Sequence, residues 1–191
     1  MKTGTRLIYV AFAIVMLAIS AVTANGALND LYASVNGAAN NGGGFIYQYN
    51  PGGVQRIFAS GLSEPRGVAF DHFGNLFVAN NFFDDNSQTF QGTIVRITPD
   101  GVRSTFATLS DENFFLSDLA LDLPGNLFVM AIDATDPDLA ATIYEFTPGG
   151  VQSAFGSMPG QGFGLAFDSA GNLFAADGGS PNVNPRPISQ S

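Results

Sequence analysis

The chain has 191 residues, no cysteine and no tryptophan, and 16 acidic side chains against 7 basic ones, which gives a net charge of −9 at neutral pH. The absence of cysteine excludes disulfide bridges, zinc–thiolate sites and cysteine nucleophiles. A net negative charge of this size opposes binding to nucleic acids and to anionic membrane surfaces.

The N-terminus has the features of a secretory signal peptide. Lys2 and Arg6 precede an apolar stretch over 7–19, and Val22-Thr-Ala24 offers small residues for cleavage. The stretch is shorter than the ~20 residues that span a bilayer, which argues against a membrane anchor. We predict that residues 1–24 are a signal peptide, that helix is confined to 5–24, and that the mature protein is secreted or periplasmic, without a membrane span. Cleavage would leave five arginines, no lysine and all sixteen acidic residues.

Two motifs recur along the rest of the chain. The first, an apolar run ending in Asp and followed by Gly-Asn-Leu-Phe, covers 67–79, 118–130 and 164–176. The second, an apolar strand followed by Pro-Asp-Gly or Pro-Gly-Gly, covers 46–54, 94–102 and 143–151. A period of about 50 residues built from short strands and Gly/Pro turns is typical of propeller blades. The repeat therefore predicts an all-β fold, a β-propeller of four-stranded antiparallel blades.

In chain order we predict strands at 31–35, 45–49 and 54–59, a complete unit with strands at 67–71, 75–80, 92–98 and 102–108, a second complete unit, and a final pair within 163–177. The blade units are 28–61, 62–109, 114–157 and a partial one at 162–177, within a repeat domain of 25–179 and before a Pro-rich tail at 180–191. We expect the first two strands of each unit to be inner and the last two to be outer. The third strand carries Gln48, Arg96 and Glu145 at one repeat position, which we expect to face solvent.

About three blades are fewer than the four to eight of a closed propeller. The sequence therefore predicts an incomplete or open arc. We favour further blades that are missing from this chain, and the alternative is an arc that completes itself by association as a homodimer.

The units resemble the blades of NHL-type and gluconolactonase-like β-propellers. The resemblance rests on Pro65-Arg-Gly-Val-Ala-Phe-Asp71, on Gly74-Asn-Leu-Phe-Val-Ala-Asn80 and on Gly92-Thr-Ile-Val-Arg-Ile, and it covers roughly residues 28–177. In gluconolactonase-like propellers the residue before the Gly-hydrophobic-Ala run is typically an Asn or Asp that binds a divalent metal. The matching positions here are Arg66, Ser117 and Phe163, so the resemblance does not extend to that metal site. Glu64 could mimic an N-terminal Glu ligand of the family, but one carboxylate does not hold a divalent cation.

Candidate binding residues lie in the long connections that we expect on one face of the propeller, because binding residues concentrate in loops longer than a turn requires. The ligand-binding candidates are Asp84, Asp85, Asp111, Glu112 and, at the start of a strand, Asp118. In the connection 131–141, closely spaced carboxylates suit a hard cation that takes six to eight oxygens. We predict a weak, loop-ordering calcium site there, formed by Asp133, Asp136 and Asp138. The alternative interpretation of all these acids is a solvated rim.

The short turns on the opposite face carry the repeated residues Asp71, Asp122 and Asp168, and the only histidine, His72. Asp before a tight turn accepts hydrogen bonds from the backbone two residues on, so we interpret these residues as structural and predict no catalytic residue. The function that we predict is an exported, non-catalytic propeller whose long-loop face binds an extracellular protein, a glycan or a small molecule. The alternative is a metal-dependent hydrolase or lactonase of the gluconolactonase type, with its site incomplete in this chain.

Overall fold

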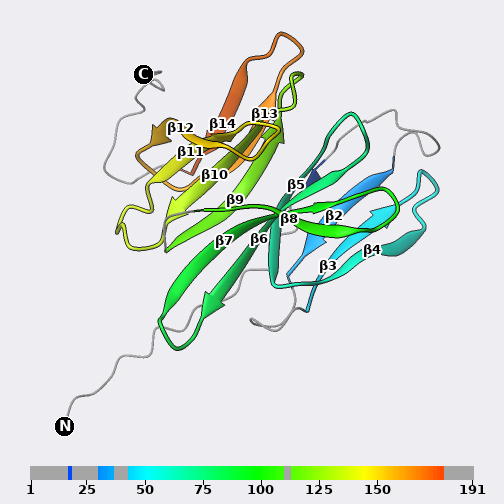
Figure 1. Ribbon diagram of the computed structural model, residues 1–191, viewed down its shortest axis with the longest axis horizontal. Helices are drawn as coiled ribbons and strands as arrows, with labels where there is room; N and C mark the ends of the chain where they lie inside the picture. The colour runs from blue at the N-terminus through cyan, green and yellow to red at the C-terminus, as the bar shows by residue number, and fades with distance from the viewer. Residues whose placement is uncertain (1–16, 19–29, 37–42, 110–112, 179–191) are drawn as a thin grey trace.

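The computed structural model describes residues 17–18, 30–36, 43–109 and 113–178. These residues form an all-β arc of antiparallel sheets that follow one another radially, each made of consecutive strands (Figure 1). Three sheets have four strands and the last has two. The predicted fold class, an open arc of propeller blades, is confirmed. Among the described residues there is no apolar helix of membrane-spanning length.

The strands of the four sheets are as follows. Blade 1 consists of β1 (Leu17–Ala18), β2 (Leu31–Val35), β3 (Gly44–Tyr49) and β4 (Gln55–Leu62). Blade 2 consists of β5 (Glu64–Phe70), β6 (Leu76–Asp84), β7 (Thr89–Ile97) and β8 (Arg103–Thr108). Blade 3 consists of β9 (Phe114–Leu121), β10 (Leu127–Asp133), β11 (Ala141–Phe146) and β12 (Gln152–Met158). The partial blade 4 consists of β13 (Gly162–Phe167) and β14 (Leu173–Asp177).

The first strand of blade 1 comes from the predicted signal peptide. Leu17 pairs with Ala33 and Ala18 with Tyr32, so at these two residues the expected helix is wrong. The pairing satisfies backbone groups at an edge of β2 that would otherwise be open, which is a reason for a strand there. The remainder of the predicted signal peptide and the tail 180–191 lie outside the described residues, and export stays a prediction.

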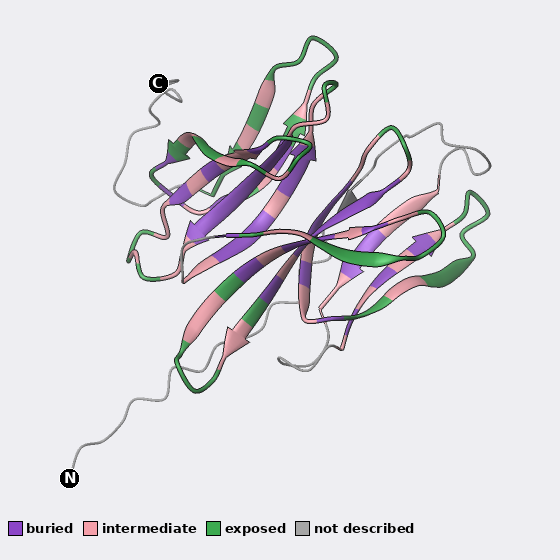
Figure 2. Ribbon diagram, viewed as in Figure 1, coloured by how far each residue is buried: buried purple, intermediate pink, exposed green. Residues whose placement is uncertain are grey.

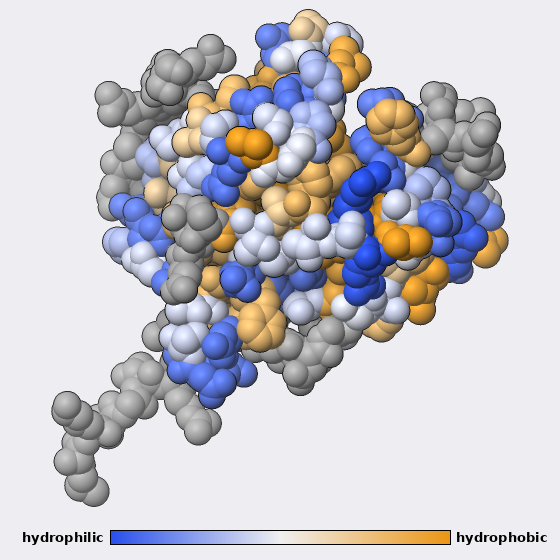
Figure 3. Space-filling model, viewed as in Figure 1, coloured by the Kyte–Doolittle hydropathy of each residue, from blue (hydrophilic) through white to orange (hydrophobic). Residues whose placement is uncertain are grey.

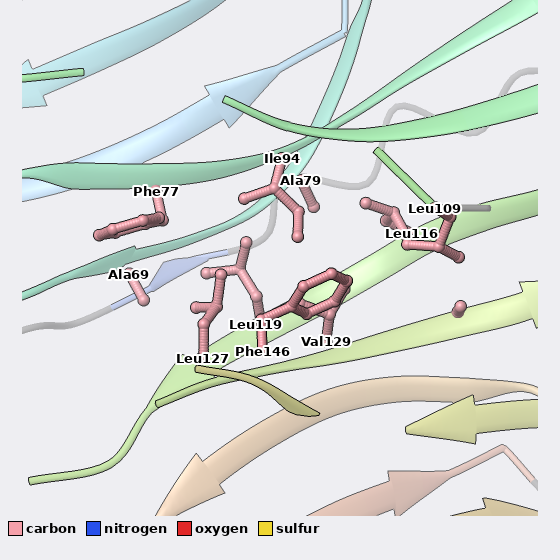
Figure 4. Close-up of a cluster of buried hydrophobic side chains, with 11 residues drawn as sticks. Ala69, Phe77, Ala79, Ile94, Leu109, Leu116, Leu119, Leu127, Val129 and Phe146 are labelled. Atoms are coloured by element: carbon pink, nitrogen blue, oxygen red, sulfur yellow. The ribbon is translucent and has the colours of Figure 1, made fainter. Parts of the chain in front are cut away.

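The hydrophobic core lies between the sheets, in one layer for each pair of neighbouring blades. The layer between blades 2 and 3 brings Phe77 and Ile94 of one sheet against Leu119 and Val129 of the next (Figure 4). Similar layers separate blades 1 and 2, and blades 3 and 4. Strand β9 packs against both β5 and β13, which places these first strands next to one another along the inner side of the arc.

In blades 2 and 3 burial falls from the inner strands to the outer ones, as predicted, whereas β14 of the partial blade 4 is mostly exposed (Figure 2). Strands β6 and β10 are largely buried, whereas β4, β8 and β12 are largely exposed. Hydrophobic residues reach the surface shown in Figure 3 in several separate places among hydrophilic ones. The expectation for the third strand is wrong at Gln48, which is only 4% exposed. Its amide nitrogen donates to Asp30, and its Oε1 accepts a hydrogen bond of 2.6 Å from Arg56 Nε, so partners replace the lost solvent.

The repeated aspartates close the turns between the first and second strands, which define the turn face of the arc. The Asp71 carboxylate accepts hydrogen bonds from the backbone N–H groups of Phe73 and Asn75 and from Asn75 Nδ2, at 2.7–2.9 Å. Asp168 and Asp122 make the equivalent bonds to Asn172 and Asn126. The structural interpretation of these aspartates agrees with their geometry.

The opposite end of the arc, from which β5, β9 and β13 start, is the loop face. Its first predicted loop, 81–91, is mostly strand, because β6 and β7 stay paired as far as Asp84 and Thr89. Contacts between tilted aromatic rings explain this extension, since the ring centroids of Phe83 and Phe90 lie 4.7 Å apart and those of Phe90 and Phe115 of blade 3 lie 5.7 Å apart. The second loop, 134–140, is short, and its Ala134 and Leu139 pack against the core between blades 3 and 4.

Candidate functional site

Three β-bulges at equivalent positions define the candidate site. In β9 the register shifts between Leu116 and Asp118, so Ser117 has no direct partner on β10. In β13 the shift leaves out Phe163, and in β5 it lies between Pro65 and Val68, at Arg66 and Gly67. A bulge re-aims a side chain and is over-represented next to active sites. We call Arg66, Ser117 and Phe163, together with the adjacent Asp118, the bulge site.

The bulge site lies near the loop face, because all three bulges fall in the first half of their strands. Neighbouring inner strands approach closely there. A Cβ built on Gly67 would lie 2.6 Å from Asp118 Cα and 2.9 Å from Leu119 N, so β5 and β9 meet at a distance that only glycine allows. Arg66 directly precedes Gly67, and Ser117 directly precedes Asp118. Arg66 and Ser117 therefore lie at the same level of the two neighbouring strands.

Arg66 is a partly buried cation held in a defined position. Its Cζ lies 4.8 Å from the ring centroid of Phe115, within cation–π range, and its carbonyl oxygen accepts a hydrogen bond from Ser34 Oγ. Its Nε is buried without a hydrogen-bond partner among the described residues. Burial lowers the pKa of Arg66, and the negative charge of Glu64 partly opposes that shift.

Ser117 is 2% exposed, and its hydroxyl has no hydrogen-bond partner within the described part of the chain. The strand around it is fixed by Asn81, which is fully buried. Asn81 Oδ1 accepts a hydrogen bond from Leu116 N at 2.7 Å, and its Nδ2 donates to Leu116 O at 3.0 Å and to Glu64 O at 3.3 Å. Asn81 thus clamps β9 to blade 2 directly before the bulge.

Asp118 links the inner strands of blades 3 and 4. It occupies the repeat position at which Gly67 and Gly164 stand in the other units. Its Oδ2 accepts a hydrogen bond of 2.7 Å from Leu165 N of β13. Burial raises the pKa of Asp118 to about 6, although hydrogen bonds from the backbone N–H groups of Leu165 and Leu119 act in the opposite direction. The role of Asp118 as a ligand-binding residue stays a prediction.

The other predicted binding residues are not brought to the bulge site. Asp84 accepts hydrogen bonds from Asn86 N and Ser87 Oγ within the β6–β7 turn, and these bonds lower its pKa. Asp85 is exposed at the same turn, and Asp111 and Glu112 lie outside the described residues.

The predicted calcium ligands lie together on the β10–β11 connection. Asp133 accepts hydrogen bonds from Thr135 N and Oγ1, and Asp136 accepts one from Asp138 N. The described ranges contain no group of three or more His, Asp or Glu side chains that could hold a metal ion. The weak calcium site stays a prediction.

A pocket of about 860 Å³ lies far along the strands from the bulge site, on the turn face. It is lined by the three Asp turns and by apolar side chains of blades 3 and 4, including Phe128, Ile143 and Phe155. These apolar residues belong to the face of blade 3 that points towards blade 4, and blade 4 has only two strands with which to cover it. We therefore interpret the pocket as uncovered packing surface and place the candidate site at the bulges.

Sequence reasoning identified Arg66, Ser117 and Phe163 only as departures from a family pattern. It missed Asn81 and Phe115, because neither residue is repeated and each acts on a neighbouring blade. The repeat carries one usable signal. Asp118 stands at the position where the other two units have glycine, Gly67 and Gly164.

Comparisons with known proteins agree with this architecture. No protein-family model matches the sequence, and no curated protein matches it significantly. Among solved structures, the calcium-binding protein regucalcin from Agrobacterium tumefaciens has a TM-score of 0.54 at 16% identity, over 72% of this chain and 45% of its own. A putative gluconolactonase has a TM-score of 0.53 at 18% identity, over 78% of this chain and 51% of its own. A luciferin-regenerating enzyme has a TM-score of 0.51 at 12% identity, over 78% of this chain and 50% of its own.

The chain thus spans about half the length of the solved structures that it matches. At these identities the likeness concerns the fold alone. The fold is that of a β-propeller, similar to the fold of the regucalcin and putative gluconolactonase structures, and the described residues form an arc of it.

Proposed function

We propose that this chain is part of a propeller that binds and hydrolyses a small lactone or a related ester, and that the substrate is held at the bulge site. The observation that carries the proposal is the alignment of three bulges on neighbouring inner strands, which places a cation, a hydroxyl and a buried carboxyl at equivalent or adjacent positions of β5 and β9. The similarity of the fold to a putative gluconolactonase favours this reaction over non-catalytic binding. Non-catalytic binding of an extracellular protein, a glycan or a small molecule is the second candidate.

Each polar residue of the site has a chemical task in this proposal. The Arg66 guanidinium, a permanent donor, would bind the ester carbonyl and stabilise the negative charge that develops on its oxygen when water adds. The Ser117 hydroxyl would donate a further hydrogen bond. Asp118 would accept a proton from the attacking water, because a carboxyl with a pKa of about 6 is mostly ionised at neutral pH and still a useful base. It would return this proton to the leaving alkoxide oxygen when the acyl C–O bond breaks.

The resemblance to gluconolactonase-like propellers implies a divalent cation at this place, and the described residues do not fit one. The three aligned positions carry a guanidinium, a hydroxyl and a phenyl ring, so a single oxygen ligand stands where a cation needs several. We therefore derive no step through a metal. Calcium enters the proposal only as a brace for the loop with Asp133, Asp136 and Asp138, a role that the calcium-binding description of the regucalcin neighbour makes worth testing.

The test is hydrolysis of a panel of γ- and δ-lactones by the purified protein, with and without added calcium. The release of protons by the acid that forms measures the rate. We expect hydrolysis that Arg66→Met and Asp118→Asn each abolish. His72→Asn is the control, because His72 lies on the turn face away from the bulges. A folded wild-type protein that hydrolyses no member of the panel would refute the proposed reaction and leave non-catalytic binding.

A further inference from the structure

We infer that the bulge site binds the oxyanion of a small organic acid and does not bind a cation. The inference deepens the proposed function and rests on it for the location of the site. It assigns the chemical class of the ligand from the groups that the site leaves without partners.

Both unpartnered groups at the site can donate hydrogen bonds. Arginine has five N–H donors and no acceptor, and it keeps its charge at neutral pH even when burial lowers its pKa. Arg66 Nε and Ser117 Oγ are buried without partners among the described residues. Such donors cost free energy when they are left unsatisfied. A ligand rich in acceptors and negatively charged would satisfy both, whereas a metal ion would be repelled by the guanidinium and could accept no hydrogen bond from it.

The guanidinium is arranged for such a ligand before it binds. Phe115 lies against Arg66 at 4.8 Å, and Phe115 is itself packed against Phe90. The bond from Ser34 fixes the Arg66 backbone. A guanidinium held against an aromatic ring can still offer its donor edge to two oxygens of one carboxylate, the geometry that arginine favours. Phe163, at the third bulge, is 37% exposed and offers an apolar surface for the carbon skeleton.

The negative charge of Glu64 distinguishes an anion site from a cation site. Its negative charge acts on Arg66 and raises the arginine pKa, so the two side chains influence each other electrostatically. At an oxyanion site Glu64 is a repulsive neighbour of the ligand. At a cation site it would be an attractive neighbour and a candidate ligand beside Asp118. Removal of its charge should therefore change the affinity in opposite directions in the two cases.

The experiment is calorimetric titration of the purified protein with gluconate, with inorganic phosphate and with calcium chloride. We expect gluconate to bind, Arg66→Met to weaken that binding by about 10- to 100-fold, as the loss of charge-assisted hydrogen bonds implies, and Glu64→Gln to strengthen it. Ser117→Ala should weaken it by a smaller factor. Arg103→Met, which removes an arginine from the outer strand β8, should leave it unchanged. Arg66→Lys keeps the charge without the planar donor edge, and it replaces Arg66→Met if that variant does not fold.

Absence of gluconate binding would overturn the inference, and so would either of two further results. They are competition between calcium and gluconate together with weaker binding in Glu64→Gln, and gluconate affinity that Arg66→Met and Arg66→Lys leave unchanged. Phosphate binding that exceeds gluconate binding and depends on Arg66 supports an oxyanion site but rejects the organic acid as its ligand. Arg66-dependent gluconate binding without lactone hydrolysis supports the inference and refutes the proposed reaction. Lactone hydrolysis without Arg66-dependent gluconate binding supports the proposed reaction and refutes the inference.

Discussion

Asp118→Asn is expected to make the protein more stable at alkaline pH while it removes activity. Burial raises the pKa of Asp118 to about 6 in the folded protein, from the ordinary value of 3.8. Between these values the folded protein binds more protons than the unfolded chain, so the free energy of unfolding falls as the pH rises through this window. A difference of about two pKa units corresponds to a loss of about 3 kcal/mol above pH 6, as an upper bound.

Asparagine keeps an oxygen that can accept the hydrogen bond from Leu165 N and carries no charge to desolvate. The variant should match the wild type near pH 3, below both pKa values, and exceed its stability at pH 8 by up to about 3 kcal/mol, or roughly 6–12 °C in Tm for a domain of this size. Urea denaturation at the two pH values measures the difference. Asp138→Asn, which removes the same charge from an exposed loop position, is the control. A variant that is less stable than the wild type at pH 8, or that differs equally at both pH values, would refute the reasoning.

Gly67→Ala should destabilise the fold by more than about 2 kcal/mol in urea denaturation, because its Cβ would meet the Asp118 backbone at 2.6 Å; an unchanged midpoint would contradict the close approach. Calcium at roughly 0.1–1 mM should raise the Tm if the β10–β11 connection binds it, and Asp136→Ala should weaken the effect. An unchanged Tm up to several millimolar calcium would mean that these carboxylates are only a solvated rim. Light scattering should find an associated state, because Phe163 and Phe174 are exposed on blade 4 and apolar faces of this kind rarely stay uncovered; a stable monomer argues against association.

The sequence predicts what is local and repeated in this fold. The Asp turns follow from spacing alone, because Asp71 and Asn75 bond to each other within five residues of chain. The order of the strands and the difference between inner and outer strands follow for the same reason, since each unit copies the same pattern. The absence of a familiar metal-ligand set at Arg66 is equally visible in the sequence.

The remaining features depend on contacts between blades. Gln48 is buried because Asp30 and Arg56 supply partners, which a comparison of repeats does not show. The β6–β7 hairpin is longer than predicted because Phe90 packs against blade 3. Asn81 lies at the end of a repeated strand, but its partner Leu116 belongs to the next unit, so its role appears only in three dimensions.

The central claim, that the bulge site receives an oxyanion, is tested most directly by the arginine Nε–Hε resonances of the 15N-labelled protein. The chain has six arginines, so the signals are few, and Arg66→Lys identifies the one that belongs to Arg66. Titration with gluconate should shift the Arg66 Nε–Hε signal in a saturable manner and leave that of Arg103 in place. An Arg66 signal that does not move while gluconate binds, or that responds to calcium and not to gluconate, would contradict the claim.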